Sequence, residues 1–439
     1  MKVAIFSPFS PDKSGIADFC EELIFELQKH MSIELFSRMP IENKKVIEHF
    51  KIHNIQDFED ENIRKQFDNV IYHVGNNIIY HKEVVEMFLK YPGILELHDI
   101  SLHHYLAEDT FVKKDYEKYV EIMRYCHGKD GEKTARRFLN GEIRAPWEDQ
   151  SAKYTVNKHL IDKAEAVIVH SDMAKQIVKG IRPDVPVINI PLHTPDIYDD
   201  YIQYKERCKQ ELGIPKEKTV LGSFGYATVA KRIPQILEAL GRYKEQVSDD
   251  FVYYIVGKVE HIEISKLAHE FKIEKNVIVT GFTKLEDFKK YMGACDICFN
   301  LRYPTQGESS ASLHRMLGMG KPILVTAIGS FEEYPDDIVM KNSWGENEIT
   351  DIVSNLKEAL ANPSELKSRG EGAYDYANEN CNLEKNAFKY KMFLEKIKRN
   401  EYQDDYIEHF LDYLTQMELL DRDYLDTKVE LLEFVLGDV

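Results

Sequence analysis

Short apolar runs recur along the chain, and most of the stretches between them carry helical periodicity. In the first half, the runs predicted to be strands span residues 2–7, 33–36, 69–75, 93–99 and 166–171. Ile16, Phe19, Leu23 and Leu27 follow the first run at the spacing of one helix face. This alternation of strands and helices predicts a parallel sheet with right-handed crossovers.

A second series of the same kind follows a stretch rich in proline, acidic and aromatic residues at 191–204, which is interpreted as a linker. Its predicted strands span residues 220–225, 252–257, 276–282, 296–301 and 322–326. The fold class is therefore α/β, with two Rossmann-like doubly wound parallel-sheet domains that face a cleft.

The predicted domain boundaries follow from these two series. The first domain spans 1–195 and includes a polar, mainly helical insertion at about 105–163, which is either a charged surface subdomain or an acceptor-binding lobe. The second domain spans 196–380, a closing helix spans 381–399, and an acidic helical tail spans 400–439.

Composition and charge narrow the class of protein. Of 439 residues, 43% are hydrophobic and 30% are charged, which is typical of a soluble globular protein. The chain opens directly on a strand-like run, and no apolar stretch approaches the roughly 18 to 20 residues needed to span a bilayer, so a cytoplasmic location is expected. The net charge of −18 argues against nucleic-acid binding.

More than half of that charge lies in the tail. Residues 400–439 hold twelve Asp or Glu and only two Lys or Arg. Their leucine and aromatic positions predict an amphipathic helical hairpin that docks on the protein or forms a homo-oligomer, and so many acidic groups disfavour an anionic membrane. Asp421 and Asp423 imitate a metal-binding pair but are interpreted as solvated charge.

The clearest candidate site is the stretch 302–325, which reads as a strand end, a loop, a helix and a new strand. Pro304, Thr305 and Gly307 break the strand, and Ser309 and Ser310 are good N-caps for the helix. A loop between the carboxyl end of a parallel strand and a helix N-terminus is where such sheets bind anions.

Other candidates lie at equivalent strand ends. His98 and Asp99 end a strand in the first domain, and a structural role for His98 is the alternative. Gly15 opens the first helix, where it lets the backbone approach a ligand. Lys231 and Arg232 follow a strand-to-helix loop of the second domain, where they either contact phosphate or form a solvated helix start.

A metal or redox centre is not expected. Cys295 and Cys298 have the spacing of a zinc knuckle or a redox pair, but no second such pair exists, and they run into a predicted buried strand. No cofactor is predicted either.

Several motifs, in order, resemble the retaining glycosyltransferases of family four, which have the GT-B fold. They are KSGIADFCEEL, YHVGN, LHD, VHSD, GSFGYATVAKR, VTGF and GESSASLHRMLGMGKP, and the resemblance covers about residues 1–395. It is strongest to the bacterial polysaccharide enzymes of that family, several of which transfer mannose. The resemblance implies a nucleotide-sugar donor in the second domain and an acceptor bound largely by the first.

The chain departs from the family pattern at two points. Gln306 and His314 occupy the positions of the family's two glutamates, so that Glu308 is the nearest carboxylate. Tyr226 occupies the position of the phosphate-binding arginine, while Lys231 matches the lysine.

The site residues expected from the sequence and the resemblance fall into two groups. The catalytic residues are His98, Asp99 and Glu308. The donor-binding residues are Gly15, Gly225, Tyr226, Lys231, Arg232, Phe282, Arg302, Thr305, Gln306, Gly307, Ser309, Ser310 and His314.

The expected function is transfer of a sugar, with GDP-mannose as the first choice of donor, to a glycan or lipid-linked acceptor with retention of anomeric configuration. The reaction would be metal-independent and serve cell-surface polysaccharide synthesis, with peripheral association at the inner face of the membrane. One alternative is a catalytically silent GT-B partner or glycan-binding subunit, which the missing glutamates favour. A nucleotide-sugar epimerase on the same plan is a further alternative.

Overall fold

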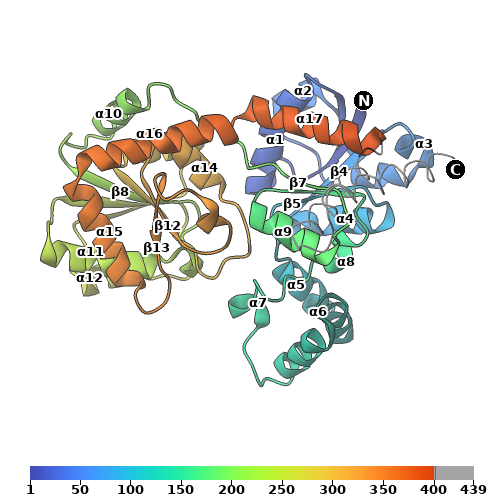
Figure 1. Ribbon diagram of the computed structural model, residues 1–439, viewed down its shortest axis with the longest axis horizontal. Coiled ribbons are helices and arrows are strands. Elements are labelled where there is room, and N and C mark those ends of the chain that lie inside the picture. Colours follow the sequence, from blue (N-terminus) through green and yellow to red (C-terminus); the bar gives the residue numbers. More distant parts are fainter. Residues whose placement is uncertain (400, 402–439) are drawn as a thin grey trace, which may run out of the picture.

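The structure is a computed structural model that describes residues 1–399 and 401, in two domains that lie side by side (Figure 1). The first domain contains a seven-stranded sheet in the order β3-β2-β1-β4-β5-β6-β7, with every neighbouring pair parallel. Its strands are β1 (Lys2–Phe6), β2 (Ser32–Ser37), β3 (Lys51–Asn54), β4 (Asn69–Val74), β5 (Ile94–Leu97), β6 (Ala166–Val169) and β7 (Val187–Asn189).

Helices connect these strands and cover both faces of the sheet. They are α1 (Gly15–Leu27), α2 (Lys44–His49), η1 (Ile55–Glu59), α3 (Glu61–Arg64), α4 (Ile78–Lys90), α5 (His103–Val112), α6 (Tyr116–Leu139), α7 (Pro146–Asp149), α8 (Lys158–Ile161) and α9 (Asp172–Ile181).

The second domain repeats the plan around a six-stranded parallel sheet in the order β10-β9-β8-β11-β12-β13. Its strands are β8 (Thr219–Phe224), β9 (Phe251–Val256), β10 (Val277–Gly281), β11 (Ile297–Asn300), β12 (Ile323–Thr326) and β13 (Val339–Asn342). Its helices are α10 (Tyr201–Glu211), η2 (Val229–Lys231), α11 (Ile233–Gln246), α12 (Ile264–Glu270), α13 (Leu285–Ala294), α14 (Ala311–Gly318), η3 (Gly329–Glu333), α15 (Glu348–Ala361) and α16 (Pro363–Asn380).

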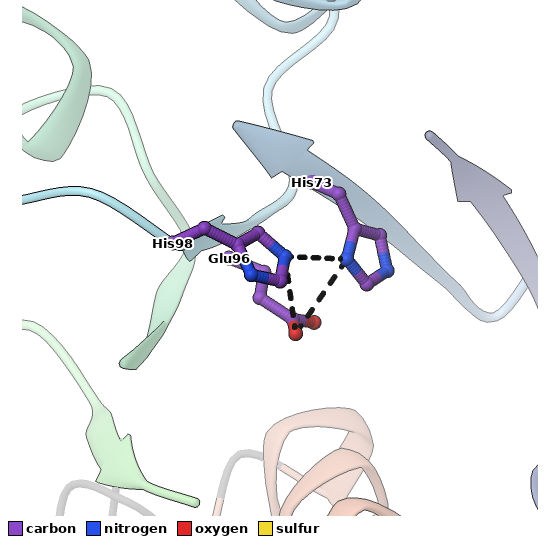
Figure 2. A group of neighbouring side chains, drawn as sticks. All are labelled: His73, Glu96 and His98. Carbon is purple, nitrogen blue, oxygen red and sulfur yellow. Dashed lines mark hydrogen bonds and ion pairs between the residues drawn. The ribbon is translucent and has the colours of Figure 1, made fainter. Parts of the chain in front are cut away.

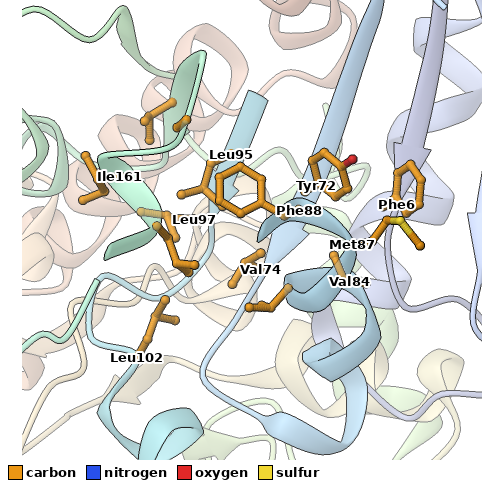
Figure 3. Packing of buried hydrophobic residues seen from close by; sticks show 14 of the residues in the cluster. Phe6, Tyr72, Val74, Val84, Met87, Phe88, Leu95, Leu97, Leu102 and Ile161 are labelled. Atoms are coloured by element: carbon orange, nitrogen blue, oxygen red, sulfur yellow. The ribbon is translucent and has the colours of Figure 1, made fainter. Parts of the chain in front are cut away.

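The central strands read as apolar runs because both of their faces are buried. In β1, Ala4 and Phe6 point into one core and Val3 and Ile5 into the other, as the two-residue period of a strand requires. The first of these cores packs Phe6 against residues of β4, β5 and α4 (Figure 3). Burial on both faces therefore explains why the sequence shows continuous rather than alternating hydrophobicity here.

The two-domain prediction is confirmed, and the strands expected from the sequence are present. Three more strands, β3, β7 and β13, were not expected, and each forms an edge of its sheet. They are only three or four residues long, so they carry little hydrophobic pattern. The acidic tail, its expected hairpin and the Asp421 and Asp423 pair lie outside the described residues.

The last described helix, α17 (Leu383–Arg399), crosses from the second domain back to the first (Figure 1). Ala387, Tyr390, Phe393 and Leu394 are buried in the first domain's core beside α1. The predicted closing helix therefore follows the second domain in the chain but packs its apolar face on the first.

The insertion projects from the first domain as a small helical subdomain formed by α5, α6 and α7 (Figure 1). It has a core of its own, which contains Leu106, Tyr119, Met123 and Tyr154. Within the described residues, none of the helices is long and apolar enough to cross a membrane.

The loop between β11 and α14 joins the two domains. The carbonyl of Gln306 accepts a hydrogen bond from the Ser101 amide at 2.9 Å, and the carbonyl of Thr305 accepts one from the Ser151 hydroxyl at 3.0 Å. Gly307, at φ +70°, lies against Ile100, and a Cβ added there would come within 1.9 Å of the Ile100 side chain. This segment of the second domain is thus fitted closely to the first.

We expect Gly307→Ala to lower the free energy of unfolding by more than backbone strain alone explains. An alanine in the left-handed region costs about 1–2 kcal/mol, and the clash with Ile100 adds about 1–3 kcal/mol. Gly213→Ala is the matched control, because Gly213 has φ +67° and open space around its Cβ position. Chemical denaturation of both variants measures the difference, and equal losses would contradict the close fit at Ile100.

Candidate active site between the domains

A cavity of about 790 Å³ lies between the carboxyl edges of the two sheets. Gly15, His98 and Asp99 line it from the first domain. From the second domain it is lined by seven of the predicted residues, namely Gly225, Tyr226, Lys231, Phe282, Arg302, Ser309 and Ser310, and by their neighbour Ser312 in α14. Most of the expected site therefore converges in one place.

Lys231 is a buried basic residue of the second-domain wall. Its ammonium group donates a hydrogen bond to the carbonyl of Phe224, and a Cβ on Gly225 would lie 2.7 Å from that nitrogen. Gly225, at φ +87°, therefore provides the space that lets Lys231 approach the strand end. Burial, reinforced by the nearby Arg302, lowers the pKa of Lys231 well below its usual range. A bound anion would reverse that shift.

The N-terminus of α14 opens on the same cavity. Ser310 caps the helix by accepting a hydrogen bond from the Leu313 amide, and its hydroxyl donates one to Asn300 at 3.0 Å. Ser309 donates to the carbonyl of His170, across the domain boundary, at 3.1 Å. Free amide groups and the helix dipole at this position favour an anionic ligand.

His98 and Asp99 lie on the opposite wall, at the end of β5. The ring of Phe19 packs edge-on against His98 with centroids 5.1 Å apart. Burial raises the pKa of Asp99 to about 6, although its carboxylate accepts a hydrogen bond from the Asn76 amide at 2.7 Å. Burial lowers the pKa of His98 well below its usual value, so its imidazole is neutral.

Two aromatic side chains border the cavity in the second domain. Tyr226 is 48% exposed and Phe282 is 77% exposed, unusually high values for large apolar rings. They provide a flat surface for a planar group next to the cations.

Arg232 does not line the cavity. Its guanidinium pairs with the buried Glu348 and lies over the ring of Tyr303. The expectation that Arg232 contacts the donor is corrected, because the ion pair with Glu348 keeps its guanidinium out of the cavity lining.

His314 is also directed away from the cavity. It is 1% exposed, with Nδ1 bonded to the Ser310 carbonyl at 2.8 Å and Nε2 to the Tyr334 hydroxyl at 3.2 Å. It therefore stabilises α14 from inside instead of binding a donor.

The loop residues Thr305, Gln306 and Gly307 serve the contact between the domains and do not line the cavity. Glu308, expected to be catalytic, closes this loop from within. Its carboxylate accepts hydrogen bonds from the Thr305 hydroxyl and the Gln306 amide and pairs with Arg302 at 3.2 Å. The structure thus gives Glu308 an orienting role toward Arg302, which corrects the expectation of a catalytic carboxylate.

An ionic group that lines the cavity was not expected from the sequence. Arg315 of α14 pairs with Glu22 of α1 at 2.8 Å and with Asp196 of the connecting segment. Asp18, one helical turn before Glu22, also lines the cavity, and burial raises its pKa to about 6. The i, i+4 spacing of Asp18 and Glu22 was visible in the sequence. Arg315, with which Glu22 pairs, lies almost 300 residues further along the chain.

A second cluster of polar side chains includes His98 and was not expected from the sequence. His73, Glu96 and His98 are all buried, and their side-chain ligand atoms lie within 4.8 Å of one another. This spacing is compatible with either a metal ion or a hydrogen-bonded network. Cys295 and Cys298, weighed above as metal ligands, are instead buried in the second domain's core.

Comparison with known proteins gives one family match and several matches of fold. Residues 205–376, which contain most of the second domain, match the sequence model of the family described as Glycosyl transferases group 1. No curated protein sequence matches the chain significantly.

Solved structures share the whole fold. HepE of Anabaena, solved in complex with UDP, has a TM-score of 0.64 at 14% identity, covering 90% of this chain and 100% of HepE. Sucrose-phosphate synthase of Thermosynechococcus elongatus has a TM-score of 0.65 at 13% identity, with coverage of 90% and 99%. WaaG, a glycosyltransferase involved in lipopolysaccharide biosynthesis, has a TM-score of 0.58 at 15% identity, with coverage of 89% and 99%. The chain therefore has the GT-B fold.

We expect binding of a nucleoside diphosphate to take up a proton through Lys231. Burial lowers the pKa of this lysine in the free protein, and an adjacent diphosphate raises it again, so affinity falls as the pH rises through the range in which the free lysine loses its proton. Isothermal titration with UDP and GDP in buffers of different ionisation enthalpy, at about pH 6 to 9, measures the uptake.

Lys231→Met should abolish this uptake and weaken binding. Lys218→Met is the matched control, because Lys218 pairs with Asp250 outside the cavity. Proton uptake that persists in Lys231→Met would assign the shift to another group.

Proposed function

We propose that the protein is a retaining glycosyltransferase that moves a sugar from a nucleoside diphosphate to a glycan or lipid-linked acceptor. The observation that carries this proposal is the division of the cavity between two walls. Lys231, Arg302 and the N-terminus of α14 line one wall, and His98 and Asp99 line the other. The match to the glycosyltransferase family model falls on the cationic wall, which is the expected donor side.

The chemistry requires stabilisation of a diphosphate leaving group. Lys231 and Arg302 place positive charge where the negative charge develops, and the amides at the start of α14 add donors and the helix dipole. Preorganised groups of this kind contribute roughly 3–4 kcal/mol each when removed one at a time. Tyr226 and Phe282 are then available to stack on the nucleobase beside the phosphates.

His98 acts on the sugar from the opposite wall. Its imidazole is neutral, so it supplies a hydrogen-bond donor or acceptor to a sugar hydroxyl without a fixed charge. The carboxylate of Asp99 accepts a hydrogen bond from the Asn76 amide and so stabilises the adjacent loop. We assign retention to attack on the same face of the sugar, with the leaving phosphate accepting the proton of the acceptor.

The donor and the setting follow from the resemblance and from the relatives. GDP-mannose is the first choice because the motifs are most similar to those of polysaccharide enzymes that transfer mannose. UDP-glucose is the second, because HepE has been solved with UDP and with UDP-glucose. We place the reaction in the cytoplasm, at the inner face of the membrane, in the synthesis of a cell-surface polysaccharide, as the role of WaaG in lipopolysaccharide biosynthesis suggests.

One observation favours a second candidate function, that of a catalytically silent partner of an active transferase. Gln306 and His314 replace both family glutamates, and neither lines the cavity. A silent partner would bind a glycan or a nucleotide without turnover. Thermal shift with a panel of UDP-, GDP-, ADP- and dTDP-sugars, followed by a hydrolysis or transfer assay, separates the two functions. Stabilisation by a donor without any turnover would support the silent partner, and no shift with any donor would contradict nucleotide-sugar binding altogether.

We expect His98→Ala to reduce kcat by roughly 10²-fold or more while the Kd of the nucleoside diphosphate stays within about twofold. The reason is that His98 faces the sugar, whereas the phosphates are bound by the other wall. The Tm of the variant and its nucleotide affinity control for damage to the fold. Equal losses of affinity and turnover would assign His98 a structural role.

A further inference from the structure

A group of buried polar side chains lies directly beneath His98 (Figure 2). His73 lies in β4, one residue before its end, Glu96 lies within β5 and His170 follows β6, and these three strands are neighbours in the sheet. Glu96 is 0% exposed and His73 is 1% exposed. A carboxyl group without solvent is costly unless its environment compensates for burial.

The distances define a compact network around one carboxyl oxygen. Oε1 of Glu96 lies 3.5 Å from Nδ1 of His73, 3.7 Å from Nε2 of His98 and 3.5 Å from Nε2 of His170. Nδ1 of His73 lies 3.0 Å from Nε2 of His98, which is hydrogen-bonding distance. The hydroxyl of Tyr390 donates to Oε1 of Glu96 at 2.7 Å.

The protonation of this network follows from burial and geometry. His170 donates from Nδ1 to the carbonyl of Ile190 at 2.8 Å, so the lone pair of its Nε2 is directed at Glu96. Burial raises the pKa of Glu96 to about 8 and lowers that of His73 to about 3 and that of His170 to about 4. At neutral pH the cluster is therefore uncharged, with Glu96 as a carboxylic acid among neutral imidazoles.

The same atoms could coordinate a metal ion, but the spacing favours hydrogen bonds. In a tetrahedral zinc site with bonds of about 2.0–2.1 Å, neighbouring ligand atoms lie about 3.3 Å apart. The 3.0 Å between His73 and His98 is shorter and matches an N–H···N bond. Tyr390 also donates to the carboxyl oxygen that a cation would need.

We propose that Glu96 and Tyr390 are positioning residues for His98, an inference that rests on the proposed function. Tyr390 fixes Glu96, whose Oε1 lies beside Nδ1 of His73, and His73 forms the hydrogen bond with Nε2 of His98. Nδ1 is then the ring nitrogen left for the cleft, and the tautomer and orientation of His98 are set from below. Phe19 packs against His98 and His170 and limits the movement of both rings.

The position of Tyr390 gives this network a wider consequence. Tyr390 belongs to α17, which arrives from the second domain and buries its apolar face in the first. Asn386, one turn earlier, donates to the carbonyl of Pro191 at 2.7 Å and fixes the same helix. Correct docking of α17 is therefore required for the His98 side of the cleft, although the helix itself does not line the cavity.

Tyr390→Phe tests the proposal by removing one hydroxyl and keeping the ring. With the donor identified by the panel, we expect kcat to fall roughly 10-fold to 100-fold and the Kd of the nucleoside diphosphate to stay unchanged. Tyr72→Phe is the matched control: the Tyr72 hydroxyl is also buried and donates to a carbonyl, that of Tyr91, at 2.7 Å, but it does not contact the cluster. Equal kcat values for the two variants would overturn the proposal.

Two substitutions of Glu96 separate positioning from general stability. Glu96→Gln imitates the neutral acid and should retain most of the activity, whereas Glu96→Ala removes the acceptor of the Tyr390 hydroxyl and the polar group beside His73 and should lose at least as much kcat as Tyr390→Phe. If Glu96→Gln and Glu96→Ala were equally inactive at equal Tm, a neutral hydrogen-bonding group would not be the requirement, and the proposal would fail.

An independent readout does not need turnover. ¹⁵N NMR of labelled histidine reports the tautomer of His98, which we expect to be single in the native protein and mixed in Tyr390→Phe and Glu96→Ala. An unchanged His98 tautomer overturns the positioning role even if the enzyme is active. A changed tautomer supports it even if no donor is turned over, so failure of the proposed function remains distinguishable. Zinc that copurifies with the native protein at one ion per chain and is lost in Glu96→Gln would replace the proposal with a metal site.

Discussion

Hydrogen bonds from the first domain to the loop between β11 and α14 hold the two sheets with their carboxyl edges facing each other. The bonds from Ser101 and Ser151 go to main-chain carbonyls, so they constrain the course of the loop whatever its side chains. The same loop contains Arg302 and ends at Ser310, both of which line the cavity. One segment therefore forms both the contact between the domains and part of the cationic wall. A displacement of the loop at the domain contact would also move the residues of that wall.

The second constraint is the cost of placing ionisable groups out of water. The protein meets it in two ways. Lys231 and Arg302 lie at the cavity, where a phosphate group can compensate for lost solvation. Without such a ligand, the carboxylate of Glu308 pairs with the guanidinium of Arg302. Glu96 lies deeper, where no ligand reaches it, and there the cost is avoided by protonation and by the hydroxyl of Tyr390. Burial therefore prepares one wall for an anion and keeps the Glu96 and histidine cluster behind the other wall neutral.

The replaced glutamates illustrate how the site differs from the family pattern. The positions of Gln306 and His314 are used for the domain contact and for the packing of α14 against Tyr334. The carboxylate of Glu308 then orients Arg302 from within the loop. This arrangement keeps the cation in place although neither position of the family's glutamate pair holds a carboxylate.

The sequence by itself determined the two-domain architecture and ten of the residues that line the cavity. Apolar runs identify strands that are buried on both faces, and the segments that follow those strands supply His98, Asp99, Lys231 and Arg302. The short edge strands β3, β7 and β13 escaped notice, because an edge strand needs little hydrophobic pattern to pair.

Only the tertiary structure decided what the polar residues do. Arg232 and His314 look like site residues in the sequence, but their partners Glu348 and Tyr334 hold them away from the cavity. Glu96 is a single polar residue within a buried strand. Its role depends on Tyr390, which lies 294 residues further along the chain. Periodicity and motifs report on neighbours in sequence, whereas the charge, direction and partner of a buried group are set by segments that meet only when the chain folds.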